Sequence, residues 1–271
     1  RPQALKGLRS VCVLCGSSLL RGAFPSGESP GNAGASSDLE RKTASQASWN
    51  CDMAFAMSTT FTILLGGDAE VTDRLKAVVT GSRVIAADGG MRHAAMLGLT
   101  PEMWVGDFDS TDPALFERYA RVPRLEFPAA KAMTDGEIAV EQALVRKAKL
   151  LIFVGGLGGT RSDHAFQHLM QGVSLAERGI EVLLTSGLEE AVPLLPGTLA
   201  LDLPQGSLFS ILGLDTLTGL SITNARYPLE RFDVPFGSAR TISNVAEGRV
   251  AFALESGHAL VIARPYDFTG A

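Results

Sequence analysis

Residues 103–110 read Met-Trp-Val-Gly-Asp-Phe-Asp-Ser, and this stretch decides how the chain around it is interpreted. Its apolar beginning predicts a buried strand with Trp104 in the core, and Asp107 and Asp109 follow where that strand ends. Carboxylates at positions i and i+2 of an extended segment face the same side of a sheet. Because open α/β sheets bind ligands at the carboxyl ends of their strands, the stretch predicts such a sheet with an acidic site at its edge.

Strands and helices alternate on both sides of this stretch. Apolar runs at residues 61–65, 84–87, 150–154 and 180–184 predict further strands. Apolar residues at helical spacing predict helices between them, as at 134–147. Repetition of strand and helix predicts the α/β class, with a mostly parallel, Rossmann-like sheet covered on both faces.

The pattern changes after about residue 188, where turns rich in Gly, Pro and Asp separate short apolar runs. We expect strands at 199–203, 208–212, 217–223, 240–243, 249–254 and 259–263. Evenly spaced short strands without helices predict an all-β sandwich or roll. The chain is therefore expected to hold an α/β domain at 57–187 and a β domain at 188–271.

Residues 1–56 differ from the rest of the chain. Residues 21–47 are rich in Ser, Gly, Ala and Pro without a helical or strand period, which suits disorder or a loose extension. We expect the folded part to begin near Met57 and the preceding segment to be dispensable, with a targeting or regulatory extension as the alternative. All three cysteines lie in this segment, so no disulfide framework is indicated and a cytoplasmic location is expected.

The composition limits the kinds of partner. The 271 residues are 46% hydrophobic, which is enough for a large core. The formal net charge of −5 argues against a general nucleic-acid binder. No apolar run approaches the roughly 20 residues of a membrane-spanning helix. We therefore expect neither nucleic acid nor a membrane as a partner.

Glycine-rich turns follow the other predicted strands. Gly67 and Gly89 stand in Gly-Gly turns that let the backbone approach a ligand closely. Residues 155–164 read Gly-Gly-Leu-Gly-Gly-Thr-Arg-Ser-Asp-His and lead into a helix whose N-terminus favours anions. Arg161 adds a planar fork for phosphate oxygens. The segment is neither a Walker A loop nor a dinucleotide-binding loop, because the required endings and spacings are missing.

A third carboxylate, Asp135, could complete a cluster with Asp107 and Asp109. Hard oxygen ligands gathered at one point are what Mg²⁺ and a polyphosphate require. Simpler roles stay open: Asp109 could cap the next helix, Asp135 could complement a helix dipole, and Arg161 could pair only with Asp163.

Taken together, these motifs resemble the thiamine pyrophosphokinase family. The likeness rests on residues 87–90, 106–110, 131–137, 159–164 and 241–248. Order and spacing agree from about residue 61 onward. The resemblance implies a homodimer with sites formed between facing subunits, and transfer of a pyrophosphoryl group from the co-substrate ATP to the hydroxyethyl group of thiamine, giving thiamine diphosphate and AMP.

The resemblance also assigns residues. Asp107, Asp109 and Asp135 look like the Mg²⁺-binding acids, and they are expected to be catalytic together with Arg161. Nucleotide binding is assigned to Gly67, Asp88, Gly89, Gly159, Thr160, Arg161 and Asp163. Substrate binding is assigned to Thr134, Ser243 and Asn244. The chain departs from the family pattern at Thr160, Ala132 and His168, which usually hold a Gly, an Asp and an Asn.

The residues alone leave two other functions open. One is a different Mg²⁺-dependent phosphoryl or nucleotidyl transferase, which would release other products. The other is a non-catalytic sensor of thiamine or a nucleotide. Within the transferase reading, either Asp107 or Asp135 could accept the proton of the attacking hydroxyl.

Overall fold

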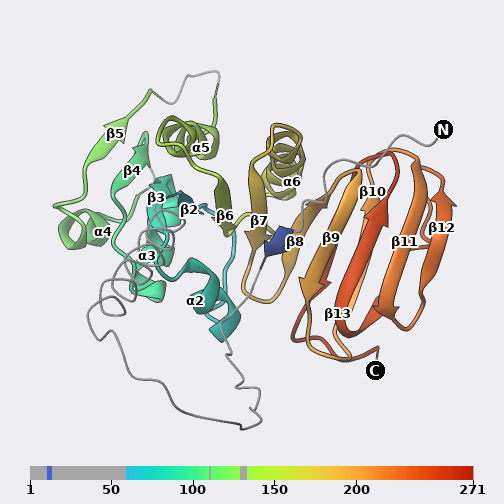
Figure 1. Cartoon of the computed structure of the whole chain (residues 1–271). Helices are drawn as coiled ribbons and strands as arrows, with labels where there is room; N and C mark the ends of the chain where they lie inside the picture. Colours follow the sequence, from blue (N-terminus) through green and yellow to red (C-terminus); the bar gives the residue numbers. More distant parts are fainter. Residues whose placement is uncertain (1–10, 14–58, 110, 129–132, 271) are drawn as a thin grey trace, which may run out of the picture.

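The computed structural model describes residues 11–13, 59–109, 111–128 and 133–270. Ser110 and Lys131, which belong to the motifs, lie outside these ranges, and so does most of the segment 1–56. Among the described residues, the strands join through hydrogen bonds into one large sheet (Figure 1). In the same part of the chain, no helix has the length and apolarity needed to cross a membrane.

One half of this sheet is parallel, in the spatial order β7-β6-β2-β3-β4-β5. Its strands are β2 (Thr60–Leu64), β3 (Arg83–Ala87), β4 (Met103–Gly106), β5 (Arg124–Glu126), β6 (Leu150–Val154) and β7 (Glu181–Thr185). The parallel sheet expected from the apolar runs is confirmed, and only the short β5 was not predicted.

Helices cover both faces of the parallel half (Figure 1, left). They are α2 (Asp73–Val79), α3 (Met91–Leu97), α4 (Pro113–Arg118), α5 (Asp135–Val145) and α6 (Ser162–Glu177). Strand β2 shows the alternation: Phe61 and Ile63 belong to the core under α5 and α6, whereas Leu64 belongs to the core under α2 and α3. Burial on both faces explains why these strands read as continuous apolar runs.

The other half is built from strands alone, as expected. They are β8 (Glu190–Leu194), β9 (Gly197–Asp202), β10 (Leu208–Gly213), β11 (Leu217–Ala225), β12 (Leu229–Val234), β13 (Asn244–Leu254) and β14 (Ala259–Arg264). Strand β13 pairs with β10 only near its start and with β9 and β11 further along. The β half thus folds over on itself, and Phe209 of β10 packs edge-on against Phe252 of β13, with ring centroids 5.7 Å apart.

The two halves meet without a break in the sheet. Strand β7 pairs with β8, and β8 pairs with β14, both antiparallel. Arg74 of α2 donates two hydrogen bonds to the buried carboxylate of Glu190 in β8, at 2.9 and 2.8 Å. The division into domains at 57–187 and 188–271 stays a prediction, and the hydrogen-bonded sheet crosses it.

Two further predictions concern the strand at 240–243 and the segment 1–56. The strand predicted at 240–243 is wrong: these residues form a turn, because Ser243 has the left-handed φ of 60° and cannot continue a strand. Within the segment expected to be dispensable, β1 (Val11–Val13) pairs in parallel with β9. Whether the segment can be removed stays a prediction.

Candidate active site

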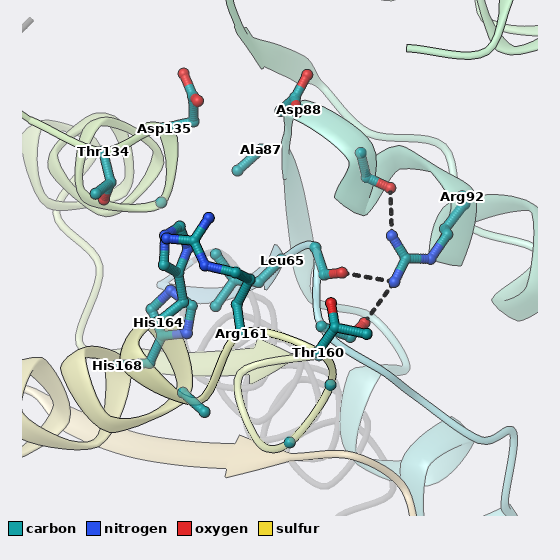
Figure 2. A pocket seen from close by; sticks show the side chains of 18 of the residues that line it. Leu65, Ala87, Asp88, Arg92, Thr134, Asp135, Thr160, Arg161, His164 and His168 are labelled. Carbon is teal, nitrogen blue, oxygen red and sulfur yellow. Dashed lines mark hydrogen bonds between the residues drawn. The ribbon is translucent and has the colours of Figure 1, made fainter. Parts of the chain in front are cut away.

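A cavity of about 650 Å³ opens at the carboxyl edge of the parallel half (Figure 2). It lies where the chain changes direction across the sheet: β2, β3, β4 and β5 follow one another to one side, and β6 starts again on the other side of β2. Such a switch point separates two neighbouring loops, and open α/β sheets bind ligands in the crevice between them. The cavity is lined by Leu65, Gly66, Gly67, Ala87, Asp88, Gly89, Arg92, Asp107, Met133, Thr134, Asp135, Gly136, Gly155, Gly158, Gly159, Thr160, Arg161, His164, Ala165 and His168.

At Gly67 and Gly155, two backbone segments that line the cavity pack directly against each other. A β-carbon on Gly67 would overlap the carbonyl oxygen of Gly155, so no larger residue fits there. The Gly67 carbonyl lies 2.9 Å from Nε2 of the buried His93. Because a carbonyl oxygen only accepts, Nε2 donates this hydrogen bond, and burial lowers the pKa of His93, which favours the neutral ring. The turn predicted to allow close approach of a ligand is therefore held rigidly from below.

Two of the three expected acids line this cavity, and the third does not. Asp107 and Asp135 both line it, Asp107 after β4 and Asp135 at the first turn of α5. Asp109 is exposed and does not line it, although its backbone N–H donates to Oδ1 of Asp107 at 3.3 Å. Among the described residues, no three His, Cys, Asp or Glu side chains meet as metal ligands. The three acids are thus neighbours of one cavity rather than a closed cluster.

This donor set fits Mg²⁺ held jointly with a phosphate. Mg²⁺ keeps most of its waters and takes one or two carboxylates plus substrate phosphates, rather than a cage made by the protein alone. The cavity offers the hard oxygens of Asp107 and Asp135, with Asp88 beside them. Figure 2 shows Asp88 and Asp135 at one end of the cavity and Thr160 toward the other.

Asp88 is the most constrained of these acids. It begins the short helix η1 (Asp88–Gly90) directly after β3 and has a positive φ of 41°, which is uncommon outside glycine. Its carboxylate accepts a hydrogen bond from the Thr111 hydroxyl at 3.2 Å. The side chain predicted for the nucleotide site therefore lies at the cavity in a fixed orientation.

The glycine-rich loop reaches the cavity through Gly159, Thr160 and Arg161. Gly159 needs its left-handed φ of 93° to turn the loop into α6. Arg161 donates to both carboxylate oxygens of Asp163, at 2.9 and 2.7 Å, and this pairing holds the pKa of Asp163 far below its ordinary value. Asp163 does not line the cavity, so its observed contact is with Arg161.

Two further side chains close the cavity from α5 and α6. Thr134 caps α5: its hydroxyl accepts from the backbone N–H of Glu137, and the Glu137 carboxylate accepts from the backbone N–H of Thr134. His168 is buried, and burial together with the neighbouring His164 ring lowers its pKa. In the described part of the chain, its Nδ1 has no hydrogen-bond partner. His168 therefore lines the cavity with a ring whose charged form is disfavoured by burial.

Arg92 is a cavity residue that sequence reasoning missed. Its guanidinium donates to the carbonyls of Gly66 at 2.6 Å, Gly67 at 2.8 Å and Gly89 at 3.2 Å (Figure 2). It thus links the loops after β2 and β3, and it places a positive charge beside these three carbonyl oxygens. The only signal in the sequence is a basic residue one helical turn after Asp88.

Ser243 and Asn244 lie in the β half, away from this cavity. Asn244 lines a separate cavity of about 490 Å³, which shares no residue with the first. Its amide is already bonded: Oδ1 accepts from the backbone N–H groups of Tyr227 and Val245, and Nδ2 donates to the Tyr227 carbonyl. Ser243 is exposed. One chain therefore does not bring the expected thiamine-binding pair to the acids.

Comparisons with known proteins agree with the motifs. The family model described as "Thiamin pyrophosphokinase, catalytic domain" matches residues 76–184. The thiamine pyrophosphokinase of Bacillus subtilis is similar with a TM-score of 0.67, 24% identity, and coverage of 77% of this chain and 100% of its own. For the enzyme of Candida albicans the values are 0.66, 13%, 78% and 92%, and for the yeast enzyme 0.62, 12%, 77% and 86%. No curated protein matches the chain.

These likenesses to solved structures show the fold. The family model adds the sequence signal, and the segment that it matches contains Asp88, Arg92, Asp107, Asp135 and Arg161. The resemblance inferred from the motifs is confirmed.

Proposed function

We infer that this chain is a thiamine pyrophosphokinase, which transfers a pyrophosphoryl group from ATP to the hydroxyethyl group of thiamine and releases AMP. The observation that carries this function is the cavity at the switch point. It combines carboxylates, two arginines and a glycine-rich loop within about 650 Å³, in the segment that matches the family's catalytic domain. These are the groups that a polyphosphate needs around it.

In the proposed reaction the thiamine hydroxyl oxygen attacks the β-phosphorus of ATP. The bond between that phosphorus and the oxygen bridging to the α-phosphorus breaks, and AMP leaves with the bridging oxygen. The hydroxyl proton passes to a carboxylate oxygen of Asp107 or Asp135, both of which line the cavity. Most of the rate enhancement then comes from holding the reactants in line and from stabilising charge.

Binding of ATP is proposed to use the glycine turns and the arginines. Gly67, Gly89 and Gly159 allow the phosphates to approach the backbone, with Asp88 and Thr160 beside them. Arg161 is proposed to donate from one edge of its guanidinium to the phosphate oxygens while the other edge stays bonded to Asp163, as the bidentate pair suggests. Arg92 adds a second positive charge.

Asp107 and Asp135 are proposed to hold Mg²⁺ together with the phosphates, and Asp109 to reach it through water. When bound, Mg²⁺ neutralises phosphate charge and makes the β-phosphorus more electrophilic. The neighbouring Thr134, which caps α5, keeps Asp135 at the cavity edge and is proposed to contact substrate there.

The thiamine site is proposed to be completed by a second copy of the chain, so that the enzyme is a homodimer with sites between subunits. The separation of Ser243 and Asn244 from the acids within one chain supports this arrangement. Exposed aromatic side chains in the same region of the β half, Tyr227 and Phe236, offer apolar surface for such a contact. A cytoplasmic location, expected from the cysteine content, stays part of the proposal.

Product analysis tests the function directly. The full chain is incubated with ATP, Mg²⁺ and thiamine, and the nucleotide and thiamine products are separated. Equal amounts of AMP and thiamine diphosphate are expected. ADP with thiamine monophosphate would instead mean attack at the γ-phosphorus, and thiamine binding without any product would indicate a sensor; either result would overturn the proposed reaction.

A further inference from the structure

Trp104 contacts the two loops that carry Asp88 and Asp107. It is fully buried in β4, as expected for a core residue, but its indole N–H donates to the backbone carbonyl of Asp88 at 2.9 Å. Its ring packs edge-on against Phe108, with centroids 5.0 Å apart. One side chain thus reaches the end of β3 and the loop after β4.

Both contacts fall on strained backbone. Asp88 and Phe108 have φ angles of 41° and 61°, and residues with a β-carbon adopt this region only when the surroundings hold them there. Each of these two residues with a positive φ is an acidic residue or a neighbour of one. Asp88 is itself acidic, and Phe108 lies between Asp107 and Asp109. Trp104 supplies a hydrogen bond to the first and an aromatic contact to the second.

The two loops also touch each other. A β-carbon on Gly106 would lie 3.2 Å from Cα of Asp88, which leaves little room between them. Phe116 of α4 completes the aromatic group, with its ring 5.1 Å from that of Trp104 and 5.9 Å from that of Phe108. Movement of either loop would therefore disturb the same buried group.

We propose that Trp104 is a positioning residue that holds Asp88 and the loop 107–109 in one fixed arrangement for ATP and its metal ion. This deepens the proposed function and rests on it. Trp104 does not line the cavity. It acts through the Asp88 carbonyl and the Phe108 ring, so its loss should disorder two nucleotide-site loops together while the sheet remains intact.

Three variants separate positioning from packing. Trp104→Phe keeps a ring but removes the indole N–H, and Phe116→Leu keeps the N–H but removes one ring. Phe61→Leu is the matched control: Phe61 is a fully buried aromatic residue at the start of β2, at the opposite end of the strand from the cavity. Each full-length variant is measured for thermal unfolding, for amide hydrogen exchange, and for ATP affinity by calorimetry with Mg²⁺ and without thiamine.

Trp104→Phe is expected to speed exchange in peptides covering both 88–90 and 107–109 and to weaken ATP binding about tenfold, because the Asp88 carbonyl loses its hydrogen-bond partner. Phe116→Leu should speed exchange at 107–109 only. Phe61→Leu should lower the melting temperature and leave ATP affinity within about twofold, since its change is confined to the core.

Equal exchange at both loops in Trp104→Phe and in the unaltered protein would overturn the proposal, and so would a loss of ATP affinity in Phe61→Leu as large as in Trp104→Phe. If Trp104→Phe does not fold, the half-buried Phe116→Leu decides: unchanged exchange at 107–109 would overturn the proposal. Failure of the proposed function looks different, because the unaltered protein would then bind ATP without releasing AMP when thiamine is added.

Discussion

The polar side chains that line the two cavities have different surroundings. At the edge of the parallel half, Asp107 and Asp135 line a cavity of about 650 Å³ between strand ends. In the β half, Asn244 lines a cavity too, but all of its amide hydrogen bonds go to the backbone of Tyr227 and Val245. Both places were assigned to ligands by motif. The difference teaches that the two motifs do different work within one chain: the first gathers carboxylates around a cavity, whereas the second ties two backbone segments together.

The largest effect is expected at the open cavity. Asp107→Asn keeps the size of the side chain but removes its charge, and should lower kcat for thiamine diphosphate formation about 10³-fold, the scale for a group that stabilises transition-state charge. Thermal unfolding should barely change, because Asp107 is partly exposed. Steady-state kinetics over a range of Mg²⁺ concentrations measures this. Activity within threefold of the unaltered enzyme would remove Asp107 from the site.

The junction between the two halves should show the largest effect on stability. Arg74→Met leaves the buried Glu190 carboxylate without its partner and should cost about 3 kcal/mol of unfolding free energy. Arg264→Met is the matched control, since Arg264 is exposed and its partners Glu189 and Asp267 are only half-buried, and such pairs are worth under about 1 kcal/mol. Denaturant titration compares the two. Equal losses would mean that burial of Glu190 does not matter.

A smaller loss of stability should distinguish Asn244 from its neighbour Ser243. Asn244→Ala removes hydrogen bonds to partly buried backbone groups and should lower the unfolding free energy by about 2 kcal/mol. Ser243→Ala, at an exposed position, should change it by less than about 0.5 kcal/mol. A raised KM for thiamine in Ser243→Ala at unchanged stability would establish Ser243 as a thiamine contact. A stable Asn244→Ala would contradict the structural role of this amide.

The smallest effect depends on pH and concerns the far end of α6. His258 lies 2.6 Å from Asp215 and 3.1 Å from Glu177, and the hydrogen bond to Asp215 raises its pKa above 6.5. A raised pKa stabilises the fold below about pH 6.5, and this contribution is lost as the pH rises through the folded value. His258→Gln should therefore differ most from the unaltered protein in acid, by under about 1 kcal/mol because the groups are exposed. Melting curves between pH 5 and about 9 give the difference; a difference that grows with pH would contradict the pairing.

The sequence predicts the parallel half well because its strands are buried on both faces, where hydrophobicity alone decides the pattern. It does not predict strands β8 and β12, where charged residues weaken the apolar pattern. Strand β8 carries Glu190 and Pro193, and Glu190 becomes buried only because Arg74 reaches it from 116 residues away. Strand β12 pairs only with β11 and has an exposed, charged face, so its apolar signal is weak.

The site shows the same limit. Strand ends predicted the positions of Asp88 and Asp107, because parallel strands bring their carboxyl ends together, and a helix start predicted that of Asp135. The roles of Arg92 and Trp104 could not be predicted, since both bind backbone carbonyl oxygens, which every residue carries and no motif marks.

The uninterrupted pairing from β7 through β8 to β14 has a consequence for how the molecule is assembled. A fragment ending at residue 187 would expose the edge of β7, a strand with four buried positions, and such an edge invites pairing with another chain. The same core cluster holds Leu64 of β2 and Val261 of β14. We therefore expect the parallel half and the β half to unfold together, as one cooperative unit.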